Sequence, residues 1–248
     1  MNFITINQGN LNHEHICCSI SDEREDSGLV KKKKWLNERL KEGLVFRKLD
    51  ARGKIFIEYL PAEVAWAPIA ADGYFYINCF WVSGSYKSKG YGKQLIESCI
   101  SETSGSKGLV VLGSKKKKPF LSDATFLKKY GFAVCDTAEP YFELLVRKNN
   151  PNDADPMFLP HARKPVVDCG PGIDLFYTSQ CPFAPDYAAI LADHAGKTGI
   201  NLRVHHIDTL QKARNHPAPW STYSIFKDGQ FVTHEILTAA KLDALAGL

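Results

Sequence analysis

A short basic turn is the stretch of this 248-residue sequence whose residue types and spacing best fit chemistry. It comprises Lys87, Ser88, Lys89, Gly90, Tyr91, Gly92 and Lys93, between a strand-like apolar run at 74–82 and a segment of helical spacing at 92–101. Glycines at 90 and 92 let the backbone approach a ligand closely, and the first amides of a helix point outward at the positive end of its dipole. The turn therefore predicts a phosphate or pyrophosphate site; the alternative is a basic turn that caps an ordinary helix.

Cys181 is a second candidate, because it follows a predicted strand and opens a turn before a helix. Such a position can lower the pKa of a thiol through the helix N-terminus. Ala184 stands where a Cys-x-x-Cys motif has its second cysteine, so no disulfide cycle can run within this stretch. We expect either a reactive thiol that works alone or a structural position, and we favour both over a redox enzyme.

The elements that would position the basic turn occupy residues 1–148 and predict an α/β (α+β) domain with a mixed sheet. Apolar runs predict strands at 3–6, 44–49, 54–60, 74–82, 108–112, 132–135 and 141–146, and helical spacing predicts helices at 10–19, 30–42, 92–101 and 119–130. In the last of these helices Ser122 is the expected N-cap. The strand at 108–112 is apolar throughout, which is typical of a strand buried on both faces and joined to its predecessor by a helix.

Two histidine–cysteine pairs lie in the predicted helix at 10–19. His13 would lie one turn from Cys17, and His15 would lie near Cys18. The two pairs sit on different helix faces and match no zinc spacing, so we expect no metal site.

A polar, proline-rich stretch at 149–172 predicts a linker, after which the pattern of elements restarts. Residues 173–248 have the predicted order βαβαββα, which resembles the thioredoxin fold, with Cys181 where a thioredoxin carries its redox motif. We therefore expect a first domain at 1–148, a linker at 149–172 and a smaller thioredoxin-like (YoaP-like) domain at 173–248.

The first domain resembles the GNAT superfamily of N-acetyltransferases. The resemblance is carried by the basic-x-x-Gly-x-Gly pattern at 87–92 after a strand that ends at Val82, by the helix ending Tyr130-Gly131-Phe132, and by the order of elements over 1–148. Stretches 16–18, 78–82 and 118–123 look similar to the YoaP-type subgroup of this superfamily.

The resemblance implies a cofactor site. In this fold two neighbouring strands separate at the centre of the sheet, and the pantetheine arm of acetyl-CoA lies between them like one more strand. Backbone groups of Phe80, Trp81 and Val82 would hold the arm, and the Val82 amide would polarise the thioester carbonyl. Amides of residues 87–93 would hold the pyrophosphate. The acceptor would be a primary amine of a small molecule or amino acid.

The proton donor often found in the family is missing, because Leu127 stands at the position where the family often has a tyrosine. Glu58, a lone carboxylate in the apolar run 55–60, could act as the base or could face solvent. Tyr141 could act as the acid or could be a packed aromatic residue. Cys79 and Cys135 could in principle carry an acyl group, but no histidine stands at a diagnostic spacing.

Composition sets wider limits. The chain is 44% hydrophobic with a formal net charge of +4. The lysine runs at 31–34 and 115–118 are expected on the surface, so we expect no nucleic-acid partner. No apolar run approaches the roughly 20 residues that span a bilayer, and seven cysteines fit a reducing compartment, so we expect a cytoplasmic protein without a membrane partner. Oligomerisation stays open.

The competing hypothesis is a thiol-dependent redox or thiol-recognition protein. In that case the first domain would only bind coenzyme A, without catalysis.

Overall fold

The computed structural model describes residues 2–16, 18–19 and 24–248, and the chain divides into two compact units. The first unit contains Met1–Ser21, Lys33–Ala65 and Ile69–Leu159, and the second contains Asp22–Lys32, Trp66–Pro68 and Pro160–Leu248. Two short segments from the first half of the sequence thus belong to the second unit. Each unit is described separately.

The first unit is built on a seven-stranded mixed sheet of order β1-β2-β3-β5-β6-β8-β7. Its strands are β1 (Phe3–Ile6), β2 (Val45–Leu49), β3 (Ile55–Pro61), β5 (Tyr74–Val82), β6 (Gly108–Ser114), β7 (Ala133–Ala138) and β8 (Phe142–Lys148). Neighbouring strands are antiparallel except β5 and β6, which are parallel and joined through a helix. The predicted mixed α/β sheet is confirmed.

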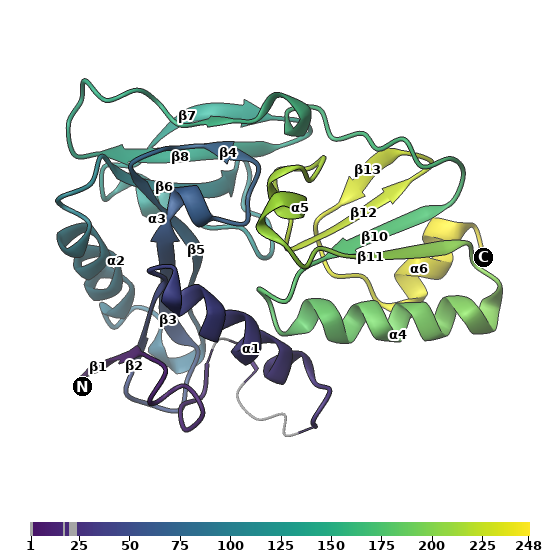
Figure 1. Cartoon of the computed structure of the whole chain (residues 1–248), viewed down its shortest axis with the longest axis horizontal. Coiled ribbons are helices and arrows are strands. Elements are labelled where there is room, and N and C mark those ends of the chain that lie inside the picture. Colours follow the sequence, from purple (N-terminus) through teal and green to yellow (C-terminus); the bar gives the residue numbers. More distant parts are fainter. Residues whose placement is uncertain (1, 17, 20–23) are drawn as a thin grey trace. The chain divides into compact units, whose positions relative to one another are not determined.

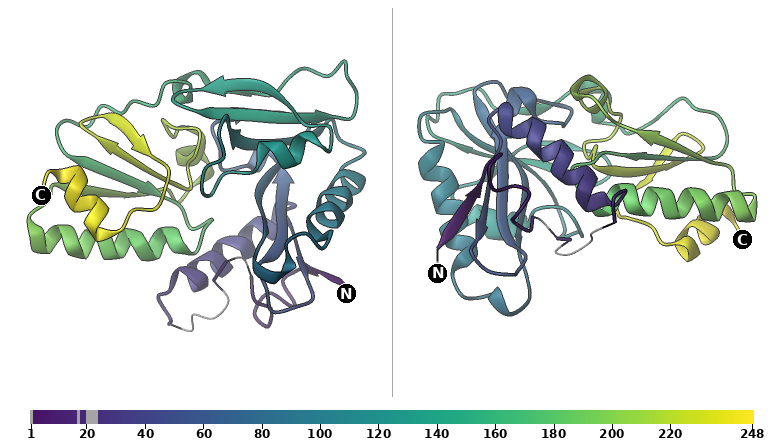
Figure 2. Two further views of the ribbon diagram at one scale, coloured as in Figure 1. Left: turned by 180° about the vertical axis from the view of Figure 1, so that it is seen from behind. Right: turned by 60° about the horizontal axis from the view of Figure 1, so that its bottom comes forward.

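Three α-helices accompany this sheet in the described part of the chain: α1 (Gly28–Lys41), which belongs to this unit from Lys33 on, α2 (Tyr91–Glu102) and α3 (Ala124–Lys128). Helices α1 and α2 lie on opposite sides of β3 and β5 (Figure 1 and Figure 2). The α2 side chains Leu95, Ile96 and Cys99 are fully buried, and they pack with β3, β5 and β6 in one core cluster. This packing fixes α2, and with it the basic turn, against the centre of the sheet.

The predicted helix at 10–19 is wrong for the residues that the structure describes there, which form turns. The side chain of Asn7 accepts hydrogen bonds from the amides of Gly9 and Asn10, and the side chain of Asn10 accepts one from the amide of Asn7. Such local bonds compete with helical ones. Cys17, part of one predicted histidine–cysteine pair, lies outside the described residues.

Two smaller features also differ from expectation. Helix α3 is shorter than the predicted 119–130, and Asp123, not Ser122, caps it by accepting from the amides of Thr125 and Phe126. The predicted linker contains a strand, β9 (Met157–Phe158), that pairs with β4 (Ile69–Ala70). One-turn 3-10 helices at Ala62–Val64, Gly84–Tyr86 and Pro160–Ala162 complete the connections.

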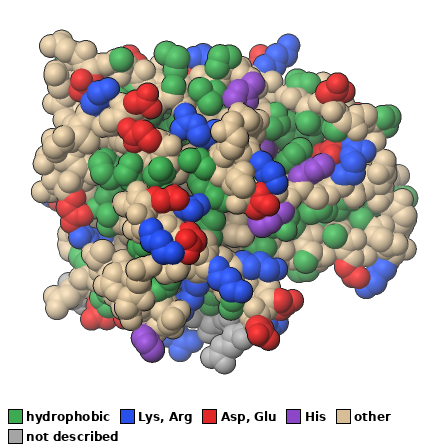
Figure 3. All heavy atoms as spheres, in the orientation of Figure 1, with side chains coloured by type: hydrophobic (Ala, Val, Ile, Leu, Met, Phe, Trp, Pro, Cys, Tyr) green, Lys and Arg blue, Asp and Glu red, His purple; other side chains and the backbone are tan. Residues whose placement is uncertain are grey.

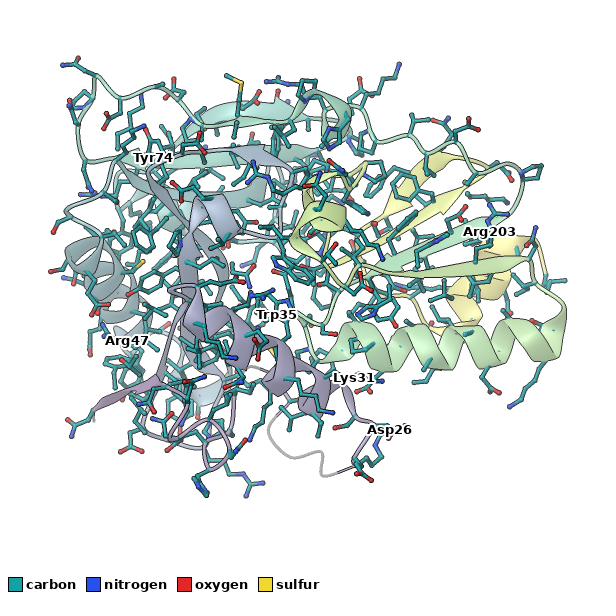
Figure 4. The ribbon with its side chains drawn as sticks, in the orientation of Figure 1. Asp26, Lys31, Trp35, Arg47, Tyr74 and Arg203 are labelled. Atoms are coloured by element: carbon teal, nitrogen blue, oxygen red, sulfur yellow. The ribbon has the colours of Figure 1, made fainter. Side chains whose placement is uncertain are left out.

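The second unit has a four-stranded sheet of order β11-β10-β12-β13 and the element order βαβαββα. Its elements are β10 (Ile173–Tyr177), α4 (Phe183–Thr198), β11 (Leu202–His206), α5 (Leu210–Arg214), β12 (Tyr223–Lys227), β13 (Gln230–Thr233) and α6 (Ala239–Ala246). Strands β10 and β11 are parallel and the other pairs are antiparallel. Apolar residues of β10, β12, α4 and α6 form its core. Arg203 of β11, labelled in Figure 4, makes a bidentate contact with the buried Asp174 of β10 at 2.8 and 2.6 Å.

The surface charges drawn in Figure 3 do not point to a particular function. On the face drawn in Figure 3, Lys and Arg side chains are interspersed with Asp and Glu. Among the residues that the structure describes, no helix has the length and apolar character needed to cross a membrane.

Candidate active site

The sheet of the first unit opens at its centre, between β5 and β6. The two strands pair only from Tyr74 with Gly108 to Ile77 with Val111. Strand β5 continues to Val82 and β6 to Ser114, and β6 stays paired with β8 along its whole length. In the described structure no further pair joins β5 to β6. This is the separation that the resemblance implied.

A bulge in β5 marks the point where the strands part. Glu58 of β3 pairs with Cys79, but the next residue, Tyr59, pairs with Ile77, so that Asn78 is an extra residue in β5. A bulge bends its strand and increases the local twist. Because the ladder to β6 ends at Ile77, directly before Asn78, the bulge accounts for the opening.

The hydrogen bonds between β5 and β3 show which backbone groups of β5 point into the opening. The amide of Ser83 donates to the carbonyl of Lys54 at 3.1 Å, beside the pair of Val82 with Ile55. Backbone groups of successive strand residues point in opposite directions. The N–H and C=O groups of Phe80 and Val82 therefore point into the opening, whereas those of Trp81 point to β3. Of the three residues expected to hold a pantetheine arm by their backbone, Trp81 is turned away.

The β6 edge of the opening is partly covered by the chain itself. Gly113, which pairs with Glu143 of β8 on one side, is bridged on the other by Ser122. A Cβ atom at Gly113 would lie 3.4 Å from the Ser122 carbonyl oxygen, at ordinary contact distance, and 2.7 Å from the side-chain end Leu145 Cδ1, which would have to shift. An extended ligand in the opening therefore has the edge of β5 to pair with.

The basic turn leads from β5 into α2 and is exposed. Lys87, Lys89 and Gly90 are all exposed, and Gly90 is the N-cap in the left-handed conformation, with φ +79°. A glycine cap supplies no side-chain acceptor, and the first turn of α2 contains no acidic residue. Such a helix N-terminus favours an anion through its amides and its dipole.

Gly92, in the first turn of α2, lies beside aromatic side chains. A Cβ atom there would lie 3.4 Å from Phe126 Cζ and 3.6 Å from Phe80 Cζ, at ordinary contact distance. Its missing side chain thus faces an aromatic cluster in which Phe126 also packs against Phe80 and Tyr130. Gly90 shapes the turn through its positive φ, and the role expected of Gly92 at the ligand stays a prediction.

The opposite end of α2 is fixed to the sheet. Arg47 of β2, labelled in Figure 4, forms an ion pair with Glu102 of α2 at 2.5 Å and a hydrogen bond with Ser98. The hydroxyl of Tyr59 donates to the same Glu102. Burial, aided by this hydrogen bond to Glu102, raises the pKa of Tyr59 far above its ordinary value, so Tyr59 stays protonated. The network holds α2 in place and leaves its N-terminus to face a ligand.

Glu58 is buried, with 1% of its surface exposed, which removes the solvent-facing interpretation. Its carboxylate accepts a hydrogen bond from the side-chain amide of Asn78. By the strand register, Glu58 lies on the same sheet face as its partner Cys79 and as Trp81, whose side chain is 41% exposed. The carboxylate is thus placed beside the start of the opening.

Tyr141 lies just beyond the end of β6, directly before β8. Its carbonyl oxygen accepts a hydrogen bond from the amide of Lys115 at 3.2 Å, and the Lys118 ammonium lies 4.1 Å from the centre of its ring. Leu127, at the position where the family often has a tyrosine, is 1% exposed and part of the core. Cys135 is half-buried, and burial raises the pKa of its thiol to about 12, which makes it a poor acyl carrier.

Cys181 belongs to the second unit, apart from the other predicted site residues. It is half-buried against the core of that unit, and its carbonyl accepts from the amide of Ala184 at 3.2 Å. The first turn of α4 contains Asp186, which accepts a hydrogen bond from the amide of Gly28 at 2.8 Å. A carboxylate at this helix N-terminus opposes the stabilisation of a thiolate.

Asn78 is the residue at the opening that sequence reasoning did not assign. The signal available was a single amide side chain in the apolar run 74–82. An isolated polar residue in a strand can mark a bulge, but only the partner strand shows where the register shifts.

An opened mixed sheet beside a basic, glycine-capped helix N-terminus is the arrangement expected of GNAT acyltransferases. The comparison with known proteins agrees. The chain is 40% identical over 247 residues, 99% of its own length and 98% of the relative's, to the uncharacterized N-acetyltransferase YoaP of Bacillus subtilis (strain 168). It belongs to the YoaP family of N-acetyltransferases and is an acyltransferase.

A family model and a solved structure also match parts of the chain. A family model described as YoaP-like matches residues 201–243, in the second unit. A solved structure from Desulfovibrio desulfuricans, named as an acetyltransferase of the GNAT family, aligns with 48% of this chain and 78% of its own, at 17% identity and a TM-score of 0.37. A likeness at that score adds nothing to the assignment.

Proposed function

We propose that the protein transfers the acetyl group of acetyl-CoA to a primary amine of a small molecule or amino acid. The observation that carries the proposal is the edge of β5 at Phe80 and Val82, whose backbone groups point into an opening beside the N-terminus of α2. A pantetheine arm offers amide groups that can pair with such an edge like a strand. The exposed basic turn lies where the pyrophosphate would follow.

The chain's own residues supply binding and proton transfer. Acetyl-CoA would supply the acetyl group as an activated thioester. The amide of Val82 would donate to the thioester carbonyl, and amides of 87–93 would hold the pyrophosphate. Glu58 would accept the proton of the amine and Tyr141 would protonate the leaving thiolate. What supports these roles is the burial of Glu58 beside the opening and the place of Tyr141 at the end of β6.

The proposal assigns a different role to each part of the chain. Residues 1–148 would carry the transferase, 149–172 would link, and 173–248 would be a thioredoxin-like accessory module. Cys181 would serve that module, either as a single reactive thiol or as a packed residue. The amine is a small molecule, and neither nucleic acid nor membrane is part of the reaction.

The test is release of free coenzyme A thiol from acetyl-CoA with a panel of amines and amino acids, paired with calorimetric titration of acetyl-CoA. We expect saturable acetyl-CoA binding and turnover with at least one amine. Tyr141→Phe should lower turnover and leave acetyl-CoA affinity within about twofold, because the hydroxyl acts in the transition state. A folded protein that does not bind acetyl-CoA would rule out the proposal.

A further inference from the structure

Asn78 has two structural features that none of the roles proposed above for the site residues explains. It is the extra residue of the β5 bulge, and the pairing of β5 with β6 ends at the residue before it. Its side-chain amide reaches back across the sheet to β3, where it donates a hydrogen bond to the Glu58 carboxylate. The bulge is therefore tied to β3 by a side chain as well as by the backbone ladder.

The acceptor of this bond is a buried carboxylate, for which each hydrogen-bond donor matters. Glu58 is 1% exposed and lies in a strand whose residues 55–60 are all buried. A buried carboxylate requires hydrogen-bond donors, and loss of a donor costs free energy. The contact with Asn78 thus favours the one register in which the extra residue sits at position 78.

Beyond the bulge, β5 keeps regular pairing with β3. Cys79, Phe80, Trp81 and Val82 pair in turn with Glu58, Ile57, Phe56 and Ile55. The register of this segment decides which residues turn their backbone to the opening. A shift by one residue would turn Trp81 into the opening and Phe80 and Val82 towards β3.

We propose that Asn78 is a positioning residue, which clamps the bulge to β3 through Glu58 and so sets the backbone of Phe80 and Val82 towards the acyl donor. The inference rests on the proposed function for its ligand, acetyl-CoA. It also gives Glu58 a second role, as the acceptor of the clamp, separate from its role as the base. The two roles make different demands, since the clamp needs only a hydrogen-bond acceptor whereas the base needs a carboxylate.

A swap of the two side-chain head groups separates the roles. Asn78→Asp places a second carboxylate against Glu58, and the two repel. Glu58→Gln keeps an acceptor for the Asn78 amide but removes the base. The double variant Glu58→Gln with Asn78→Asp restores one donor and one acceptor in reversed order, still without the base. All three variants are close in shape to the original side chains.

Acetyl-CoA affinity and turnover should respond differently. We expect Asn78→Asp to weaken acetyl-CoA binding at least tenfold, and Glu58→Gln and the double variant to bind within about threefold of the unmodified protein. Turnover should fall about 100-fold or more in both variants that lack the Glu58 carboxylate. A merely structural pair would let the double variant recover turnover as well. Asn78→Asp with unchanged affinity, or a double variant that stays weak, would overturn the clamp.

Hydrogen exchange provides a readout that does not depend on the proposed function. The amides of Trp81 and Ser83 point to β3, so they report whether β5 keeps its register. Their exchange should be faster in Asn78→Asp and return in the double variant. If the unmodified protein does not bind acetyl-CoA, the proposed function fails, and exchange alone then decides on the clamp. Should Asn78→Asp not fold, Asn78→Ala takes its place, with Glu58→Gln as the control; unchanged exchange in a folded variant contradicts the inference.

Discussion

Each unit contains a strand that leads through a short turn into a helix, and we call this connection a corner. The two corners differ in what surrounds the helix N-terminus. In the first, β5 leads into α2 through an exposed basic turn with a glycine cap. In the second, β10 leads into α4, whose first turn holds the buried residues Ala184 and Pro185 and the acidic Asp186. There Asp186 already accepts a backbone amide, that of Gly28. A Cβ atom on Gly28 would lie 1.7 Å from the Pro182 carbonyl oxygen, so the backbone packs directly on this corner.

The comparison shows that a helix N-terminus is an anion site only when nothing else uses it. Both corners have the same local order of elements and the same helix dipole. The first has exposed lysines and no acidic residue in the first turn of its helix, as the proposed anion site requires. The second is packed over and carries its own carboxylate. Cys181 therefore lies at a corner that already carries a carboxylate, that of Asp186.

The largest expected effect concerns the thiols. Burial raises the pKa of Cys135 to about 12, against an ordinary value near 9, so its thiolate fraction at pH 7.5 should be about a thousandfold lower than that of an unperturbed thiol. We expect iodoacetamide to label Cys181 at least about 100-fold faster than Cys135, as measured by peptide mass spectrometry. The fully buried Cys99, whose pKa burial also raises, is the slow control. Labelling of Cys181 as slow as that of Cys99 would make the second corner purely structural.

Acid should weaken the second unit through His216. This ring is buried against Ser224, at 2.9 Å, and burial lowers its pKa to about 4. The unfolded chain binds a proton near pH 6.5 and the folded unit does not, so this contribution is complete above pH 6.5 and is lost as the pH falls towards 4. The loss amounts to about 3 kcal/mol.

Hydrogen exchange of β12 peptides between pH 7 and 4.5, corrected for intrinsic rates, measures this loss. His216→Gln keeps a hydrogen-bonding group for Ser224 but does not titrate, so the stability of this variant should depend less on pH. Equal pH dependence in both proteins would remove His216 as the cause.

At the first corner, Gly90→Val should weaken acetyl-CoA binding about tenfold or more. Gly90 has φ +79°, a conformation that a β-branched residue adopts only with strain, so the turn must move. Gly199, the C-cap of α4, is a matched control, with φ +74° and no atom within 4 Å of the place that a Cβ would occupy. Gly199→Val should lose about 1–2 kcal/mol of stability without a change in affinity. Calorimetry that shows equal affinity in folded Gly90→Val would contradict the anion site.

The smallest effect is expected from a substitution that makes the N-terminus of α2 resemble that of α4. Lys93→Glu places an acid in the first turn of α2, as Asp186 is in α4, and should weaken acetyl-CoA binding by about three- to tenfold at low salt. Lys93 is exposed and forms an i,i+4 pair with Glu97, as Lys197 does with Asp193 in α4. Lys197→Glu is therefore the control, with unchanged affinity expected. An effect of Lys93→Glu that does not shrink in 0.5 M salt would argue against electrostatics.

Local pattern predicted much of this molecule, because the strands and helices around the first corner are encoded by their own side chains. The apolar run 74–82 and the spacing of Leu95, Ile96 and Cys99 locate β5 and α2 without their partners. The bulge at Asn78 depends on the register of β3 and cannot be deduced from β5 alone. The pairing of β4 with β9 joins residues nearly 90 positions apart, and no local signal announces it. The roles of Glu58 and Tyr141 stay predictions, because burial and neighbours do not by themselves define a proton path.

The opening in the sheet also has a mechanical consequence. The strands β1, β2, β3 and β5 form one half of the sheet and β6, β8 and β7 the other, and only the four residue pairs from Tyr74–Gly108 to Ile77–Val111 join the halves through backbone ladders in the described structure. Under force or heat, the two halves should part along this seam before either half loses its own strands. A ligand bound between β5 and β6 would join the two halves of the sheet. The sheet should therefore resist separation of its halves better when substrate is bound.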